Sequence, residues 1–320
     1  MLGWVDGYFR SREERELDLA RASYTGVGIQ MSILSDGHVL GINHVFPGSP
    51  AEAAGLARGD RIIGVDQRSA CPRPNDILGP AGTEVTLTVS SPGQPPRRVA
   101  ITRAAIVPEA PPRALWLGEP GIGYLWPGDF AAPGHVALVR AALDDIGAFD
   151  ATDSLDGLVL DLRGVFGDGP QALDAIRGLA GLFVDGPLLY LAERSARELV
   201  VAPRQPVRLD GVSLVILVDV ATDRFPVMLA AAMQERKRAQ VVGQPASAAW
   251  RLYRGVPLPH DSEILVPVGE IELLDGTRPR QSGFKPDSVM TVDWRDYPEA
   301  EDPYVAEAIR IIRTGGIGSN

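Results

Sequence analysis

The sequence predicts an α/β (α+β) protein of two domains, in which a small β-rich domain precedes a larger domain with a mostly parallel sheet. The length of 320 residues suits about two domains. Residues 25–106 contain short β-branched runs between Gly, Pro and Asp, whereas residues 120–298 alternate apolar strands with amphipathic helices. Between these patterns, VPEAPPRALWLGEP holds four prolines in fourteen residues, which is typical of a linker. We therefore place the linker at residues 107–119.

The first third of the chain is expected to form a helix and then a small sheet. Residues 1–24 are a polar, Arg/Glu-rich helical lead-in, in which Ser11 and Glu14 have the spacing of a capping box. A short helix is expected at SPAEAAGL, because Ser49 suits the N-cap and Pro50 suits the first helical position. The strands expected in residues 25–106 are GVGIQMSI, HVLGINHVF, RIIGVDQ, EVTLTVSS and RRVAITRA.

The second domain is expected to alternate strands and helices. Helical spacing of apolar residues predicts helices at PGHVALVRAALDDIGAF, at QALDAIRGLAGLF and at PVMLAAAMQERKR, the last of which begins at Pro226. Residues 299–320 are expected to add the helix VAEAIRIIRTGG and a short tail. The expected strands are GIGYLWP, GLVLDLRG, SLVILVDV, AQVVG, EILVPVG and EIELL.

Composition excludes several classes of function. The net charge of −10 disfavours binding to nucleic acid. One cysteine and four scattered histidines offer no metal-ligand spacing, so we expect neither a metal nor a cofactor. No apolar run approaches the roughly 20 residues of a membrane span. The start of the chain has no signal-peptide pattern, so as written we expect a cytoplasmic protein, or an extracytoplasmic one if an export segment is missing from this chain.

The stretch YTGVGIQ…VFPGSPAEAAGLARGDRIIGVDQRSA resembles a PDZ domain of the type found in bacterial proteases. The resemblance implies that protein or peptide C-termini bind at Gly26, Val27, Gly28, Ile29 and Gln30. A peptide could add as a strand beside Ile29–Ile33, with its carboxylate on amides around the two glycines. A second interpretation stays open, in which Gly26 and Gly28 only permit a turn into the strand.

The segments GIGYLWPGDF, LDGLVLDLRG, LVILVDV, AAAMQERKRAQVVGQ and GFKPD resemble the core of the carboxy-terminal-processing, or tail-specific, serine peptidases. With the PDZ-like part, the resemblance covers about residues 4–295. It implies a PDZ domain on an α/β peptidase core, and proteolysis by a serine that a neutral lysine activates. A desolvated lysine can lose its proton near neutral pH and accept the proton of the serine hydroxyl.

The catalytic positions depart from the family pattern. An alignment without gaps places Arg224 at the nucleophile, Ala249 at the lysine 25 residues later, and Tyr253 at the glutamine that orients the lysine. The chain has only two lysines, Lys237 and Lys285. An always protonated guanidinium can act neither as a nucleophile nor as a base. We therefore assign no catalytic residue.

The loop after LDLR holds the oxyanion in the family, and here it reads LDLRGVFGDG. Gly167 and Gly169 remain, but Asp168 between them would oppose a developing negative charge. We interpret this segment as a glycine loop that joins a strand to a helix, and we expect Asp161 and Arg163 to pair as scaffold.

Two interpretations of Arg224 stay open. Its guanidinium could pair with Asp219, Asp223 or Asp168, or it could receive a carboxylate in the former active site.

The sequence thus predicts an inactive homologue, a pseudoprotease, that binds apolar C-terminal tails in a regulatory or tethering role. A homo-oligomer, or pairing with an active relative, stays open. One alternative is an active serine-type peptidase with a relocated nucleophile, Thr222 or Ser247, and another is an assembly scaffold that binds no peptide.

Overall fold

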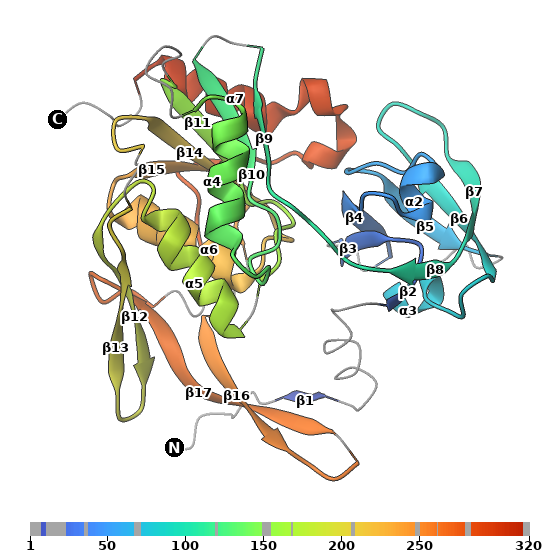
Figure 1. Cartoon of the computed structure of the whole chain (residues 1–320), viewed down its shortest axis with the longest axis horizontal. Coiled ribbons are helices and arrows are strands. Elements are labelled where there is room, and N and C mark those ends of the chain that lie inside the picture. The colour runs from blue at the N-terminus through green and yellow to red at the C-terminus, as the bar shows by residue number, and fades with distance from the viewer. Residues whose placement is uncertain are drawn as a thin grey trace.

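The computed structural model describes residues 8–10, 24–34, 38–66, 72–118, 121–148, 155–167, 169–205, 209–246, 250–260, 262–278 and 283–315. Its two domains lie side by side, with the small N-terminal domain beside the larger core (Figure 1). The helix predicted around Ser11 lies outside the described residues.

The N-terminal domain is built on a five-stranded antiparallel sheet in the order β3-β4-β5-β6-β7. Its five predicted strands are confirmed, and their apolar residues, such as Leu40, Ile62 and Leu87, form a separate small core. The short helix α2 (Pro50–Ala53) is capped by Ser49, as predicted. The other elements are β2 (Tyr24–Gly26), β3 (Ile29–Ile33), β4 (Leu40–Val45), β5 (Arg61–Val65), α3 (Pro74–Ile77), β6 (Glu84–Ser90), β7 (Arg97–Thr102) and β8 (Ala104–Ile106), which pairs with β2.

The core is organised around a six-stranded sheet in the order β18-β15-β14-β11-β10-β9. All its neighbouring strands run parallel except β9, which runs antiparallel to β10. This arrangement confirms the predicted fold class. The strands are β9 (Arg113–Trp116), β10 (Ile122–Trp126), β11 (Gly157–Asp161), β14 (Ser213–Val218), β15 (Ala239–Gly243) and β18 (Ser288–Val289).

One strand of this sheet was expected to be linker. β9 lies within residues 107–119, and it forms because Ala114 and Leu115 pack against the buried core of the domain. The prolines of this segment precede the strand and therefore do not interrupt its hydrogen bonds.

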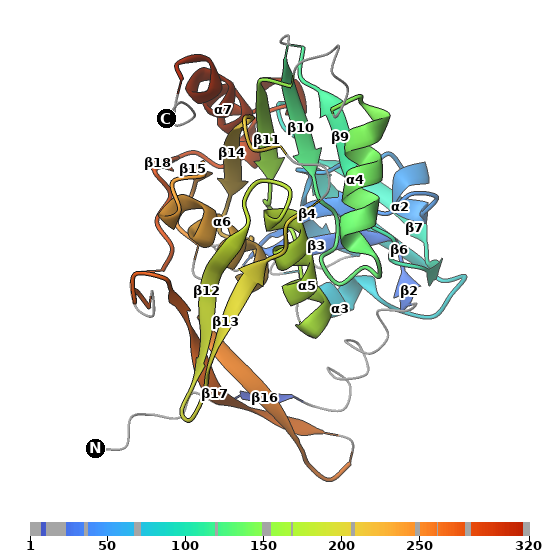
Figure 2. The ribbon, with the colours of Figure 1, turned by 60° about the vertical axis from the view of Figure 1, so that its left-hand side comes forward.

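Four helices pack around the sheet: α4 (His135–Asp145), α5 (Gly169–Ala180), α6 (Arg224–Glu235) and α7 (Pro303–Arg313). α7 packs against β11, β14 and β15, while α6 contacts α5 and β15 (Figure 2). Residues 225–233 of α6 are all buried, so this helix is enclosed by the core. The helix begins at Arg224 rather than at the predicted Pro226, because the carboxylate of Asp223 accepts a hydrogen bond from the Arg224 amide and caps it.

A second, antiparallel sheet projects from the core in Figures 1 and 2. Two predictions for the elements of this sheet are wrong. The strand β1 lies at Tyr8–Arg10, inside the predicted helical lead-in, where it pairs with β17. The two strands predicted at EILVPVG and EIELL are one strand, because β16 and β12 pair along its length. The remaining strands are β12 (Gly186–Glu193), β13 (Arg197–Ala202), β16 (Arg251–Pro257) and β17 (Glu263–Leu273).

Candidate catalytic centre and peptide-binding strand

Arg224 occupies the first position of α6, where the alignment expects the nucleophile. Its Nη1 donates a hydrogen bond of 2.8 Å to the carbonyl oxygen of Arg251. Its guanidinium carbon lies 5.2 Å from the ring centroid of Phe225 and 5.9 Å from that of Tyr253. The structure therefore brings Arg224 and Tyr253 together, whereas Ala249 lies outside the described residues.

The predicted oxyanion loop is bound by a carboxylate of the same chain. The Gly167 amide donates to Asp223 Oδ2 at 3.3 Å, and the Arg224 amide donates to Asp223 Oδ1 at 2.7 Å. The Asp223 amide donates to the carbonyl oxygen of Val165. Gly169 begins α5, so the loop does join strand to helix. A negative charge at the Gly167 amide opposes a second negative charge there. Sequence reasoning assigned this effect to Asp168, which lies outside the described residues.

The Thr222 hydroxyl is hydrogen-bonded to Asp219. Its Oγ1 donates to Asp219 Oδ1 at 3.0 Å and accepts from the Asp219 amide at 2.9 Å. Asp219 Oδ2 accepts 3.0 Å hydrogen bonds from Arg295 Nη2 and Trp294 Nε1. Asp219, one of the three carboxylates considered as a partner of Arg224, forms an ion pair with Arg295. Ser247 lies outside the described residues.

Both lysines lie at the far end of α6. Lys237 follows the C-terminus of this helix, and the carbonyl oxygen of Lys285 accepts a hydrogen bond from Gln234 Nε2. Gln234 is ten residues beyond Arg224, which corresponds to roughly 15 Å along a helix. The two lysines are therefore too distant to act as a base at the first turn of α6.

An ion-pair cluster around the buried Asp161 carboxylate joins the two domains. Arg163 binds Asp161 through Nε and Nη2 at 2.9 and 2.8 Å, which confirms the predicted pair. Arg58 of the N-terminal domain adds a 3.0 Å contact to the same carboxylate, and Tyr124 donates to it at 2.7 Å. Although burial opposes its charge, Arg163 and Arg58 hold the pKa of Asp161 well below its usual range. Sequence reasoning missed Arg58, because it lies 103 residues from Asp161.

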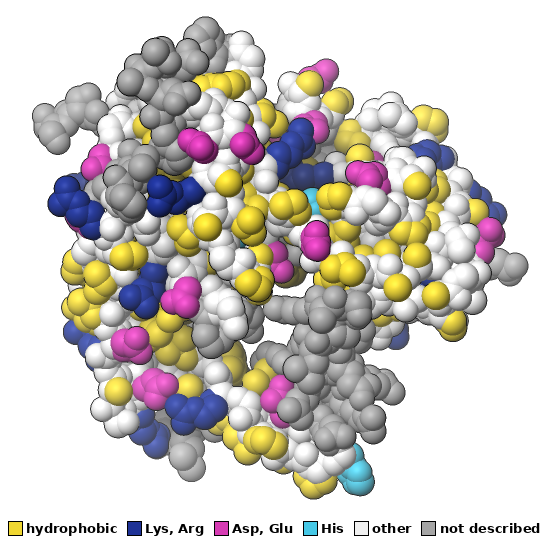
Figure 3. All heavy atoms as spheres, viewed as in Figure 1, with side chains coloured by type: hydrophobic (Ala, Val, Ile, Leu, Met, Phe, Trp, Pro, Cys, Tyr) yellow, Lys and Arg dark blue, Asp and Glu magenta, His cyan; other side chains and the backbone are white. Residues whose placement is uncertain are grey.

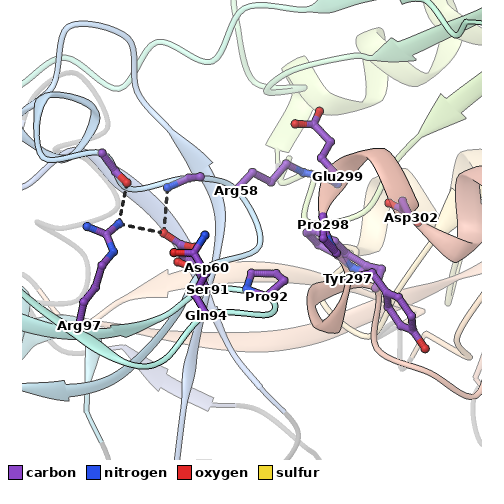
Figure 4. Close-up of a pocket in the computed structure, with 13 residues that line it drawn as sticks. Arg58, Asp60, Ser91, Pro92, Gln94, Arg97, Tyr297, Pro298, Glu299 and Asp302 are labelled. Atoms are coloured by element: carbon purple, nitrogen blue, oxygen red, sulfur yellow. Dashed lines mark hydrogen bonds and ion pairs between the residues drawn. The ribbon is translucent and has the colours of Figure 1, made fainter.

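The ionic contact continues along the boundary between the domains. Arg61 binds both Asp293 and Asp296, and Arg295 donates to Asn43 Oδ1 at 3.0 Å. Beside these pairs is a cavity of about 410 Å³, shown in Figure 4. The N-terminal domain contributes residues such as Arg58, Asp60 and Arg97 to it, and the segment before α7 contributes Tyr297, Pro298, Glu299 and Asp302.

The predicted peptide-binding residues, Gly26, Val27, Gly28, Ile29 and Gln30, lead into β3. Among the described strands β3 is at the edge of its sheet, where a further strand can pair. The carbonyl oxygen of Gly28 accepts a hydrogen bond from the amide of Phe46, the residue directly after β4. Because paired positions alternate in an antiparallel ladder, the N–H and C=O of Ile29 point away from β4. Gly28 has φ of +91°, and a Cβ there would lie 2.2 Å from that of Ser49, so the loop requires glycine.

Tyr24 contacts the free edge of β3, and sequence reasoning missed it. Its hydroxyl donates a 3.3 Å hydrogen bond to the carbonyl oxygen of Ile29, on the edge that points away from β4. Burial raises the pKa of Tyr24 to about 12, so the hydroxyl keeps its proton. In this structure the phenol thus takes one acceptor that an added peptide strand would use.

The described residues contain no group of three or more His, Cys, Asp or Glu arranged to hold a metal ion. None of the helices in the described part of the chain is long and apolar enough to cross a membrane. Charged side chains of both signs are interspersed on the face shown in Figure 3.

The sequence and fold match one peptidase family. The model of peptidase family S41 matches residues 121–290, and the PDZ domain model matches residues 16–89. The carboxyl-terminal-processing protease of Picosynechococcus is 30% identical over 297 residues, which is 88% of this chain and 68% of the relative. The protein of the same name from Synechocystis is 27% identical over 306 residues, which is 92% of this chain and 69% of the relative.

Two solved structures share the fold. The photosystem II D1 C-terminal processing protease superposes with a TM-score of 0.61 at 23% identity, covering 89% of this chain and 77% of that one. A putative S41 protease from Bacteroides fragilis gives a TM-score of 0.66 at 17% identity, covering 97% and 86%. The resemblance inferred from the sequence is confirmed, and the chain belongs to peptidase family S41, with a PDZ domain ahead of its peptidase core.

Proposed function

We propose that this chain is a catalytically inactive member of peptidase family S41, which binds apolar C-terminal peptide tails through its PDZ domain. In this role it regulates or tethers a client protein or an active relative. The observation that carries the inactivity is the pair of charges at the start of α6, where Arg224 stands at the nucleophile position and Asp223 binds the Gly167 amide.

These two charges remove both parts of the chemistry that the family uses. Arg224 carries no hydroxyl and holds its proton at every physiological pH. The Asp223 carboxylate disfavours an oxyanion beside Gly167, since two like charges would share one small site. A lysine base is absent from this end of α6, because both lysines lie near its other end.

The peptide-binding half of the proposal rests on the edge strand β3. An added strand would gain main-chain hydrogen bonds from the outward N–H and C=O of Ile29. The loop at Gly26–Gly28 offers backbone amides for a terminal carboxylate. The apolar core beneath β3 favours an apolar terminal side chain.

The alternative is an active peptidase with Thr222 as its nucleophile. It is favoured by one contact, the hydrogen bond from Thr222 to Asp219, because a carboxylate can accept a proton. Against it, the Asp219 carboxylate is already held by Arg295 and by the indole of Trp294, so it has a structural role at this position. We therefore rank it second.

The test of inactivity measures turnover of a peptide with an apolar C-terminus. We expect the wild-type chain to show no turnover above background and no labelling by a fluorophosphonate probe. The matched variant carries Arg224→Ser and Ala249→Lys, which restore the serine–lysine pair of the family, and Tyr253→Gln, which restores the glutamine that orients the lysine. Wild-type turnover that persists in Arg224→Ala would overturn the proposal, and its loss in Thr222→Ala would establish the alternative.

The test of binding is calorimetry with a peptide that ends in a free carboxylate and with the same peptide amidated. We expect heat only from the free carboxylate, because the amides around Gly26–Gly28 require a negative charge. Equal heat from both peptides, or none from either, would contradict binding of C-termini and leave an assembly scaffold.

A further inference from the structure

A second cavity, of about 230 Å³, lies between β3 and the peptidase core. It adjoins the loop at Gly167 through Phe166 and the loop after β10 through Asp129. Its walls are formed by Gln30, Met31, Phe46, Pro108, Ala110, Asp129 and Phe166.

The alternation of side chains along β3 turns one of its faces toward this cavity. Ile29 is 5% exposed and belongs to the core of the PDZ domain, so Gln30 lies on the opposite face. Its cross-strand neighbour His44 lies on the same face and stacks on Trp126 of β10, with ring centroids 4.6 Å apart. This face of β3 therefore looks onto the peptidase core.

A peptide strand added to β3 continues the same alternation. If the terminal residue pairs beside Ile29 and its side chain enters the PDZ core face, the penultimate side chain lies beside Gln30. The penultimate side chain then points toward the peptidase core, where the cavity lies. The cavity is thus a candidate for reading the second residue from the end of the tail.

The polar groups of the cavity favour a cation. Asp129 Oδ1 accepts one hydrogen bond, from the Ala131 amide at 2.8 Å, and no cation of the described residues forms an ion pair with Asp129. Gln30 Oε1 is buried and has no hydrogen-bond partner within the described part of the chain. Burial lowers the pKa of the nearby His44 and His135, so neither histidine supplies a positive charge at neutral pH.

The rest of the lining suits the apolar stem of a long basic side chain. Phe46, Phe166 and Pro108 offer apolar surface between the strand and Asp129. Lysine and arginine bury their methylene groups along such surfaces while the charged head reaches a polar partner.

We propose that the PDZ groove selects tails with a lysine or arginine immediately before an apolar C-terminal residue, and that Asp129 and Gln30 bind the cationic head in this cavity. The proposal deepens the peptide-binding function proposed above and rests on it. It assigns Asp129 and Gln30 as specificity-determining residues.

The experiment compares three fluorescent peptides that differ only at the penultimate position, with Lys, Gln or Glu, each with a free carboxylate. We expect the wild-type chain to bind the Lys peptide at least about tenfold more tightly than the Glu peptide, with the Gln peptide between them. In Asp129→Asn the Lys and Glu peptides should bind within about twofold of each other, while the affinity for the Gln peptide stays near that of wild type.

The control variant is Asp145→Asn, which removes an exposed carboxylate at the end of α4 and should keep the wild-type order. Binding of all three peptides with equal affinity would overturn the assignment of the cavity and leave C-terminal binding intact. A Lys preference that survives in Asp129→Asn would also overturn it. Failure of every peptide to bind would overturn the peptide-binding function itself and this proposal with it.

Discussion

At the scale of single residues, the two charged side chains at the start of α6 both bind the backbone of the chain. Arg224 binds a main-chain carbonyl, and Asp223 binds two main-chain amides. Each charge therefore satisfies backbone groups that a catalytic centre would leave open for substrate. In the PDZ domain, likewise, a side chain binds a backbone group at the proposed site: the Tyr24 hydroxyl donates to the carbonyl oxygen of Ile29.

Tyr24→Phe should strengthen the binding of a peptide with a free C-terminal carboxylate by severalfold. The hydroxyl occupies an acceptor on the edge of β3, and its removal frees this acceptor while the ring keeps its contact with Phe46. Calorimetry with one peptide on wild type and Tyr24→Phe measures the change. Weaker binding by the variant would show instead that the hydroxyl contributes to holding the peptide.

At the scale of elements, regular patterns were predictable and context-dependent ones were not. The strands of the PDZ domain and the parallel strands of the core have apolar or β-branched runs that indicate them locally. β12 and β13 were not predicted, because they are defined by pairing with each other and by the pairing of β12 with β17 rather than by a local pattern. The start of α6 was misplaced for a related reason, since Pro226 suits the first position but Asp223 supplies the cap.

The residues of the candidate site were likewise predictable only where a local motif indicates them. Arg224 and Tyr253 could be found because flanking motifs fix their alignment. Asp223 could not, since its contact with Gly167 spans 56 residues of sequence. The contact of Arg58 with Asp161 spans 103 residues, and nothing local to either residue indicates it.

Asp223→Ala should lower the free energy of unfolding by about 1 kcal/mol or somewhat more, because it removes the N-cap of α6. The variant also leaves the Gly167 amide without its acceptor. Urea unfolding at neutral pH measures the loss. Asp223→Asn keeps an oxygen acceptor at this position and should lose less than half as much. Equal losses would mean that the carboxylate charge, rather than the cap geometry, stabilises the turn.

At the scale of the whole molecule, charged and aromatic groups contribute to the contact between the two domains. Arg58 and Arg61 of the PDZ domain bind Asp161, Asp293 and Asp296. His44 of the same domain stacks on Trp126 and makes an edge-to-face contact with Phe46. Such contacts make the junction between the domains sensitive to pH, because one of its buried groups titrates near neutrality in the unfolded chain.

The free energy of unfolding should fall by about 2 kcal/mol more in wild type than in His44→Phe when the pH is lowered from 8 to 5. Burial, with a smaller effect from Arg58, lowers the pKa of His44 to about 4 from its ordinary 6.5. Between these two values the unfolded chain binds a proton that the folded chain does not, so stability falls as the pH falls through this window. Phenylalanine keeps the stack on Trp126 and cannot titrate, whereas His135 and all carboxylates are common to both proteins. Urea unfolding of both chains at pH 8 and pH 5 gives the difference. An equal loss of stability in the two proteins would show that His44 is not held neutral between the domains.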